Sequence, residues 1–104
     1  MRADVLKGHL DALLLAVVAN GPAHGYRIVE DLRLRSGGAF DLPEGTVYPA
    51  LHRLERGGLL ASRWTLSSGR RRRVYRITRR GRSALARQRA DWELFAHAVQ
   101  AVLA

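Results

Sequence analysis

The fold of this chain is decided by EGTVYPALHRLERGGLLASRWTLSSGRRRRVYRIT, residues 44–78. The first part has apolar side chains at helical spacing and ends at a glycine pair, which predicts a helix over 44–56. The second part alternates between apolar and polar side chains on both sides of a glycine-containing turn. This pattern predicts a β-hairpin, with strands over 59–66 and 72–78 joined by a longer loop at 67–71. A helix followed directly by a hairpin is therefore the centre of the fold.

Pro49 restricts where the helix over 44–56 can begin. An interior proline loses a backbone hydrogen bond and clashes with the preceding turn of the helix. We therefore expect Thr46 to be the effective N-cap, because Pro49 then lies in the first turn, where its missing N–H would have no partner anyway. The side chains of this helix that are expected in the core are Val47, Ala50, Leu51 and Leu54.

Two further helices are expected before this stretch and one after it. Leucines and valines recur on one face over 3–19, and Asn20-Gly21-Pro22 ends that pattern. A second helix is expected over 24–35, with a buried side formed by Tyr26, Ile28, Val29 and Leu32. Thr78 is expected to cap a last helix that runs to about Leu103 and is interrupted early by Gly81.

Three helices, a hairpin and a further helix follow one another in the order of a winged helix-turn-helix. The fold class expected is therefore α+β and mostly helical, with a two-stranded wing. We expect one domain over 1–104, because the chain is too short for two cores of normal size. Within it, residues 3–78 form the predicted DNA-binding core and residues 79–103 the predicted C-terminal dimerisation helix.

The positive charge of the chain is concentrated in one segment. Residues 63–89 hold eleven arginines and no acidic residue, whereas the rest of the chain has more acidic than basic side chains. This segment therefore accounts for the whole net charge of +9. Such a concentrated field attracts a polyanion, and the alternation of arginines with strand-forming residues indicates a folded surface. We expect Trp64 to lie in the core beneath the hairpin.

The composition argues against several classes of protein. The chain has no cysteine, so it forms neither a disulfide nor a thiolate zinc site, which is consistent with the reducing cytoplasm. Four histidines have no metal-ligand spacing, and no phosphate-binding glycine loop or activated serine is recognisable, so we expect no metal, no cofactor and no enzyme. The apolar run over 12–19 is too short to span a bilayer and predicts a buried helix, so no membrane partner is expected. The histidines are His9, His24, His52 and His97.

The two parts of residues 44–78 suit different contacts with double-stranded DNA. The helix offers hydroxyls, an imidazole and one guanidinium for base edges in the major groove, from Thr46, Tyr48, Pro49, His52 and Arg53. The hairpin offers guanidinium groups, which bind phosphates without distinguishing sequences, from Arg70, Arg71, Arg72 and Arg73. Tyr48 is the side chain that we most expect to contact nucleic acid, and packing between elements is the competing interpretation.

Several motifs resemble the PadR family of transcriptional regulators. One motif is similar to the recognition helix of that family, a second to the entry of its second helix, and a third to its wing and the start of its last helix. The residues that carry the resemblance are Gly45-Thr46-Val47-Tyr48-Pro49-Ala50-Leu51-His52-Arg53-Leu54-Glu55 with Gly58-Leu59-Leu60, then His24-Gly25-Tyr26, and finally Gly69 to Arg73 with Tyr75-Arg76-Ile77-Thr78 and Gly81.

The resemblance covers the chain from about Leu13 to its end. It implies a dimeric DNA-binding repressor of the short subgroup with a single C-terminal helix, a type of protein that is sometimes released by a small, often aromatic effector. The sequence departs from the common pattern at Arg27, where many members have an acidic residue, and at Val74, where an aromatic side chain is common. Neither position belongs to the predicted base-contacting residues, so the departures concern local packing.

The last helix has an apolar seam of its own. Large apolar side chains recur near every seventh residue, divided into threes and fours, which is typical of helices that pair. The residues predicted for dimerisation are Leu85, Trp92, Phe95, Val99, Val102 and Leu103. A two-fold dimer would place two recognition helices about 34–36 Å apart and therefore predicts a palindromic operator. For Trp92 the resemblance also implies contact with a flat effector, and ordinary dimer packing is the competing interpretation.

Two other functions remain open for the same fold. A winged helix could bind RNA, or DNA without sequence preference, through the arginines of the hairpin alone. The arginines of Arg70 to Arg73 could also contact an acidic protein partner. The helix over 44–56 distinguishes these alternatives, because only a sequence-specific protein loses discrimination when its base-contacting side chains are replaced.

Overall fold

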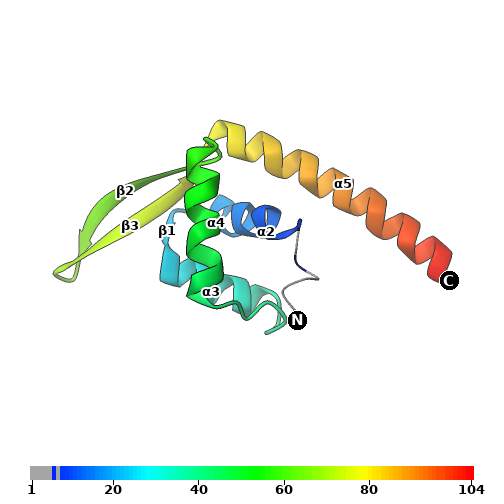
Figure 1. Cartoon of the computed structure of the whole chain (residues 1–104), viewed down its shortest axis with the longest axis horizontal. Coiled ribbons are helices and arrows are strands. Elements are labelled where there is room, and N and C mark those ends of the chain that lie inside the picture. The colour runs from blue at the N-terminus through cyan, green and yellow to red at the C-terminus, as the bar shows by residue number, and fades with distance from the viewer. Residues whose placement is uncertain (1–5, 7) are drawn as a thin grey trace.

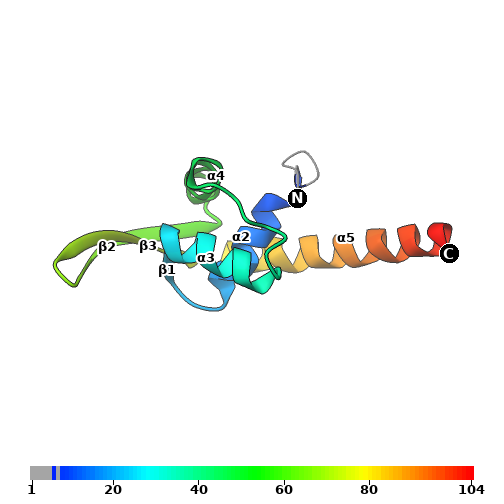
Figure 2. The same cartoon turned by 90° about the horizontal axis from the view of Figure 1, so that it is seen from below.

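The computed structural model describes Leu6 and residues 8–104, which form a winged helix with a long C-terminal helix (Figure 1). Helices α2 to α4 pack together in the middle, whereas the wing, β2 with β3, and the end of α5 extend in opposite directions (Figures 1 and 2). The molecule is therefore elongated, at 54 × 28 × 20 Å. The predicted mostly helical α+β fold with a winged helix is confirmed. The elements are α2 (Leu10–Ala19), β1 (Ala23–His24), α3 (Gly25–Arg35), α4 (Glu44–Arg56), β2 (Leu60–Ser67), β3 (Arg70–Ile77) and α5 (Arg79–Leu103).

The core lies between the three central helices, the base of the wing and the start of α5. Tyr75 is its largest fully buried side chain and lies on β3, where the wing meets the helices. Complete burial of a side chain such as leucine or valine contributes about 1.5–3 kcal/mol, so this cluster supplies most of the stabilising free energy. The four core positions predicted on α4 are confirmed, since Val47, Ala50, Leu51 and Leu54 are each at most 2% exposed.

The first two helices differ from the prediction in three respects. Helix α2 begins at Leu10 and not near residue 3, because Gly8 has a φ of +89°, outside the helical range; residues 3–5 and 7 lie outside the described part. The N-cap of α3 is His24, whose Nδ1 accepts a hydrogen bond from the backbone N–H of Arg27 at 3.2 Å. Tyr26 is 61% exposed and not buried, because it lies about 200° around the helix from Ile28, which faces the core.

Helix α4 has the predicted bounds but a different N-cap. Its N-cap is Pro43, whose carbonyl accepts hydrogen bonds from the N–H groups of Thr46 at 3.0 Å and Val47 at 3.2 Å. Thr46 is therefore not the N-cap, and Pro49 lies inside the helix. The carbonyl of Gly45, four residues earlier, receives no N–H from the proline ring. Glycine at that position is exposed, which leaves the carbonyl open to water or to a ligand.

The wing has a tighter turn than the sequence pattern predicted. Its strands pair without interruption from Leu60↔Ile77 to Ser67↔Arg70, so only Ser68 and Gly69 form the connection. Both residues have positive φ, 52° and 76°, as a two-residue type I′ turn requires. The prediction of a longer loop over 67–71 is therefore wrong. All four arginines of Arg70 to Arg73 lie in the strand, where successive side chains point to opposite faces.

A third strand completes the sheet and was not predicted. Strand β1 is only two residues long and pairs antiparallel with β3 through Ala23↔Tyr75 and His24↔Val74. The strand order is β1-β3-β2, so the base of the wing is anchored on both sides of β3. This pairing places the start of α3 beside the arginines of the wing.

Helix α5 begins as predicted and continues as one straight element. The hydroxyl of Thr78 accepts a hydrogen bond from the N–H of Gly81 at 3.0 Å and donates to the carbonyl of Gly58 at 2.7 Å. Thr78 thus caps α5 and attaches it to the segment between α4 and the wing. Gly81 is buried and does not interrupt the helix, whose second half projects beyond the body of the molecule (Figure 1).

Candidate nucleic-acid interface

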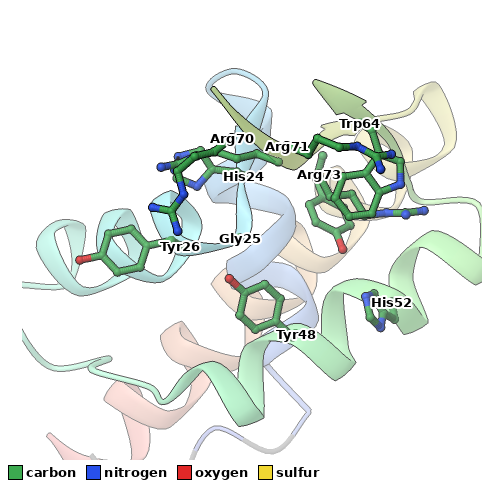
Figure 3. A pocket seen from close by; sticks show the side chains of 11 residues that line it. His24, Gly25, Tyr26, Tyr48, His52, Trp64, Arg70, Arg71 and Arg73 are labelled. Atoms are coloured by element: carbon green, nitrogen blue, oxygen red, sulfur yellow. Dashed lines mark hydrogen bonds between the residues drawn. The ribbon is translucent and has the colours of Figure 1, made fainter. Parts of the chain in front are cut away.

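Helix α4, the wing and the start of α3 enclose a cleft of about 570 Å³ (Figure 3). Within the described residues no aspartate or glutamate lines it, whereas ten of its side chains carry an N–H or O–H donor. A surface of donors and positive charges is complementary to an anion. The cleft is lined by His24, Gly25, Tyr26, Tyr48, His52, Trp64, Arg70, Arg71, Arg72, Arg73 and Tyr75.

Four of the five side chains predicted to contact bases lie on the outer surface of α4. Thr46, Pro49, His52 and Arg53 are exposed, because the core positions of the helix occupy its opposite side. Arg53 is not free, since its Nη2 lies 2.5 Å from Oδ1 of Asp11 at the start of α2. Both side chains are partly solvated, so this ion pair is weak and Arg53 keeps further donors for a ligand.

Tyr48 has a different environment from the other four. Its ring lies against the start of α3, where a methyl group built on Gly25 would be 2.7 Å from Cζ and 2.8 Å from the hydroxyl oxygen. Burial, and to a lesser extent the charge of Glu44, raises the pKa of the Tyr48 hydroxyl above its usual value. Tyr48 therefore packs between elements, and its hydroxyl stays protonated as a donor at the floor of the cleft (Figure 3).

Two of the wing arginines stack on Trp64. In the pairing of β2 with β3, Trp64 lies directly opposite Arg73, and directly opposed residues share one face of the sheet. The guanidinium carbons of Arg71 and Arg73 lie 4.9 Å and 5.4 Å from the centre of a Trp64 ring, within cation–π range. Trp64 is 54% exposed, so the prediction that it belongs to the core is wrong. The strand pair carries it outward past the helices, where the arginines and not the core cover its ring.

Arg73 is also attached to α4. It donates to the hydroxyl of Ser62 at 2.7 Å and lies 3.5 Å from a carboxylate oxygen of Glu55, to which Ser62 donates at 2.6 Å. This network connects the wing to α4 and neutralises part of the Arg73 charge. Arg73 therefore positions the wing, and Arg71 is the more available of the two arginines on this face.

Arg72 belongs to the other face of β3 and contacts His24. Its Nη1 lies 2.8 Å from Nε2 of His24, which β1 brings alongside β3. Burial, followed by the positive charges of Arg72 and Arg27, lowers the pKa of His24 below its usual value. Arg70 is exposed next to the turn. The four arginines thus differ in their surroundings, although the sequence pattern predicted the same phosphate contact for all of them.

The apolar seam of α5 is only partly where the sequence placed it. Leu85 is 7% exposed and packs in the core of its own chain, so it does not belong to an exposed seam. Trp92 and Phe95 are more than half exposed, and their ring centres lie 5.9 Å apart. His9 makes an edge contact with Trp92 at 5.2 Å. The exposed seam consists of Trp92, Phe95, Val99, Val102 and Leu103, with Leu94 as a further exposed leucine that the spacing did not single out.

Sequence reasoning missed His24 and Asp11 as members of this surface. The signal for His24 was its position directly before Gly25 at a helix start, where capping residues occur. Its contact with Arg72 depends on the two-residue strand β1, which is too short to leave a pattern. Asp11 lies 42 residues from Arg53 in the sequence, and only the packing of α2 against α4 brings them together.

Two further properties bear on the class of protein. Across Leu6 and residues 8–104, no group of three or more histidine, aspartate or glutamate side chains is placed to hold a metal ion. In the same part of the chain, no helix combines the length and apolar character that crossing a membrane requires.

Comparison with known proteins agrees with this geometry. The model of the transcriptional regulator PadR-like family matches residues 14–87. A transcriptional regulator of Mycobacterium tuberculosis is 41% identical over 86 residues, which cover 83% of this chain and 78% of that protein. A transcriptional regulator from Clostridium thermocellum has a similar structure, with a TM-score of 0.87 and 29% identity over 96% of this chain and 95% of its own. A PadR family regulator from Eggerthella lenta has a TM-score of 0.84 and 32% identity, over 96% of this chain and 86% of its own. The chain therefore belongs to the PadR family, whose members are DNA-binding transcriptional regulators and not enzymes.

Proposed function

We propose that this protein is a dimeric cytoplasmic repressor that binds a palindromic DNA operator. The observation that supports this most is the cleft between α4 and the wing, whose side chains donate hydrogen bonds and include no carboxylate within the described residues. In this proposal α4 enters the major groove and presents Thr46, His52 and Arg53 to base edges. The wing binds the adjacent phosphates through Arg70 to Arg72, while Arg73 holds the wing to α4.

The dimer is proposed to form through α5. Trp92, Phe95 and Val99 are exposed along a helix that projects away from the body of its own chain, so a second copy is the surface that can bury them. A two-fold axis through this seam would place two copies of α4 about one turn of DNA apart. In this division, residues 3–78 are the DNA-binding core and 79–103 the dimerisation helix of a single domain.

Selection from a random duplex library tests the repressor proposal most directly. At near-physiological salt and with non-specific competitor, we expect enrichment of an inverted repeat with half-sites about 10 bp apart. Replacing His52 or Arg53 by alanine should relax the enriched sequence at one position per half-site, at a cost of about 1–3 kcal/mol for the preferred base pair. Binding that disappears with salt but enriches no sequence would contradict the proposal and favour binding to RNA or DNA without sequence preference.

A small aromatic effector is proposed to bind beside Trp92. The support is the partly exposed pair Trp92 and Phe95, which offers a planar surface at the proposed dimer seam. The chain has two tryptophans, so Trp64→Phe leaves Trp92 as the only fluorophore of its kind. Planar aromatic compounds should quench its emission and weaken binding to the selected operator in parallel. Compounds that quench without releasing DNA, or a panel that does neither, would exclude an effector at this position.

A further inference from the structure

His24 takes part in two contacts that a neutral imidazole cannot satisfy together. Its Nδ1 accepts the hydrogen bond from the N–H of Arg27 at 3.2 Å, and its Nε2 lies 2.8 Å from Nη1 of Arg72. Each partner can only donate, and a neutral imidazole has one nitrogen lone pair to offer. While Nδ1 caps α3, the ring proton is therefore on Nε2, and two N–H donors face each other with no acceptor between them.

On the side of α4 and the wing, the surroundings of these two donors supply more donors and no carboxylate, whereas Asp31 lines a second cleft that His24 also borders. Tyr26, Tyr48 and Arg70 line the cleft between α4 and the wing, and no carboxylate lines it among the residues that the structure describes. Carboxylates close by are engaged elsewhere, since Asp31 pairs with Arg27 at 3.0 Å and Glu55 pairs with Ser62 and Arg73. The conflict between His24 and Arg72 is therefore not resolved by an acidic side chain of the cleft.

We propose that a phosphate group binds between the Nε2–H of His24 and the guanidinium of Arg72. One phosphate oxygen accepts from both nitrogens, which removes the conflict and keeps Nδ1 as the cap of α3. In this proposal Arg70, which lines the same cleft, donates to a second oxygen, and its charge-assisted hydrogen bond adds to the first two. The inference rests on the proposed function in one respect, because the phosphate is then one of the DNA backbone. It adds His24, on neither α4 nor the wing, to the residues that contact DNA.

The chemistry of the cleft favours a phosphate over other anions. A phosphate presents several acceptor oxygens in different directions, which matches donors that come from β1, β3 and α3. Five residues that line the cleft are exposed, so a group attached to a polymer can enter it; they are Tyr26, His52, Trp64, Arg70 and Arg71. The lowered pKa of His24 agrees with this arrangement, since a neutral ring keeps Nδ1 free to accept from Arg27.

The first experiment compares the affinity for a generic DNA duplex over a series of salt concentrations. The variants are His24→Asn, which keeps a side-chain acceptor for the cap of α3, and Arg72→Gln. His24→Asn should weaken binding about 5- to 10-fold with an unchanged salt dependence, because a neutral donor displaces no counterion. Arg72→Gln should weaken binding by a similar factor and reduce the slope by about one per subunit.

Two controls make this result specific. His97→Asn makes the same chemical change on the exposed surface of α5 and should leave the affinity unchanged. The double variant of His24 and Arg72 should weaken DNA binding by less than the product of the two single-variant factors, because both donors hold one phosphate. Equal affinity of His24→Asn and the unmodified protein, with both equally folded by circular dichroism, would overturn the proposal for a DNA phosphate.

The second experiment separates this inference from the proposed function. Inorganic phosphate is titrated into the free protein while the imidazole nitrogens are followed by NMR. The Nε2 resonance of His24 should shift and that of His97 should not. A shift together with the effects on DNA binding identifies a backbone phosphate, which then competes with the free ion. A shift without any binding of DNA identifies a site for a free phosphate compound and rejects the proposed function alone. No shift and no effect of His24→Asn on DNA rejects the site.

Discussion

Replacing Gly81 by alanine is expected to lower the free energy of unfolding by about 2–3 kcal/mol, because the new methyl group has no room. It would lie 2.8 Å from Cγ1 of Ile77 and 3.0 Å from the carbonyl carbon of Leu59. The Leu59 carbonyl cannot easily move, since it accepts a hydrogen bond from the N–H of Thr78 at 3.1 Å and also lies 3.1 Å from the Thr78 hydroxyl. Relieving the clash therefore disturbs the junction of wing and α5. Thermal unfolding should show a midpoint lower by roughly 10–20 °C.

Gly45→Ala is the matched control for this prediction. Gly45 also lies in a helix, but no atom is within 4 Å of the position that its Cβ would occupy. Alanine there should change stability little or raise it by up to about 1 kcal/mol, because alanine is the better helix former. If Gly81→Ala unfolded at the same temperature as the unmodified protein, the close packing of α5 on Leu59 would be wrong.

The elements that the sequence predicted well are those with strong local signals at both ends. Helix α4 has its predicted bounds, since both signals are local in sequence: the apolar spacing lies within the helix and the glycine pair directly follows Arg56. Helix α5 begins at the predicted cap for the same reason, because Thr78 needs only Gly81 to complete the hydrogen bond. The fold class follows from the order of such elements.

The errors arise where structure depends on residues far apart in the chain. Ser68 adopts a positive φ only because the paired strands on both sides impose a tight turn, so the two-residue turn could not be predicted from a serine at this position. Trp64 looked like a core residue by composition, but strand register places it beyond the helices and under Arg71 and Arg73. Tyr26 has the hydrophobicity of a core residue, and only the rotation of α3 against its neighbours decides that it faces out.

In the candidate site, too, local features could be predicted and contacts between distant segments could not. The exposure of His52 and Arg53 could be predicted, because the core positions of α4 fix which side faces outward. The separate roles of the wing arginines could not be predicted. Alternation along a strand shows that successive side chains lie on opposite faces, but not which of these faces lies next to His24. That assignment requires β1 beside β3, a pairing of two residues that has no sequence signal.

Phe95→Glu is expected to separate the proposed dimer and to reduce affinity for the selected operator by about 100-fold or more. Phe95 is 58% exposed in the single chain, so a glutamate there should leave the protomer folded. In the dimer the same carboxylate would be buried in an apolar seam without a partner, at a cost of about 3 kcal/mol or more. Mass in solution by light scattering and operator affinity by anisotropy check the two parts of this prediction.

His97→Glu adds the same charge to α5 and separates the two explanations for a loss of binding. His97 lies two residues beyond Phe95, about 200° around the helix, and so away from the seam. We expect this variant to remain dimeric and to lose only the small electrostatic contribution of one extra negative charge. With roughly three to five phosphates per subunit, the dimer should have a log–log salt slope of about −5 to −9, and the Phe95→Glu monomer about half of that. A Phe95→Glu protein that stays dimeric, or a monomer that keeps full operator affinity and the full slope, would show that α5 does not join the two DNA-binding cores.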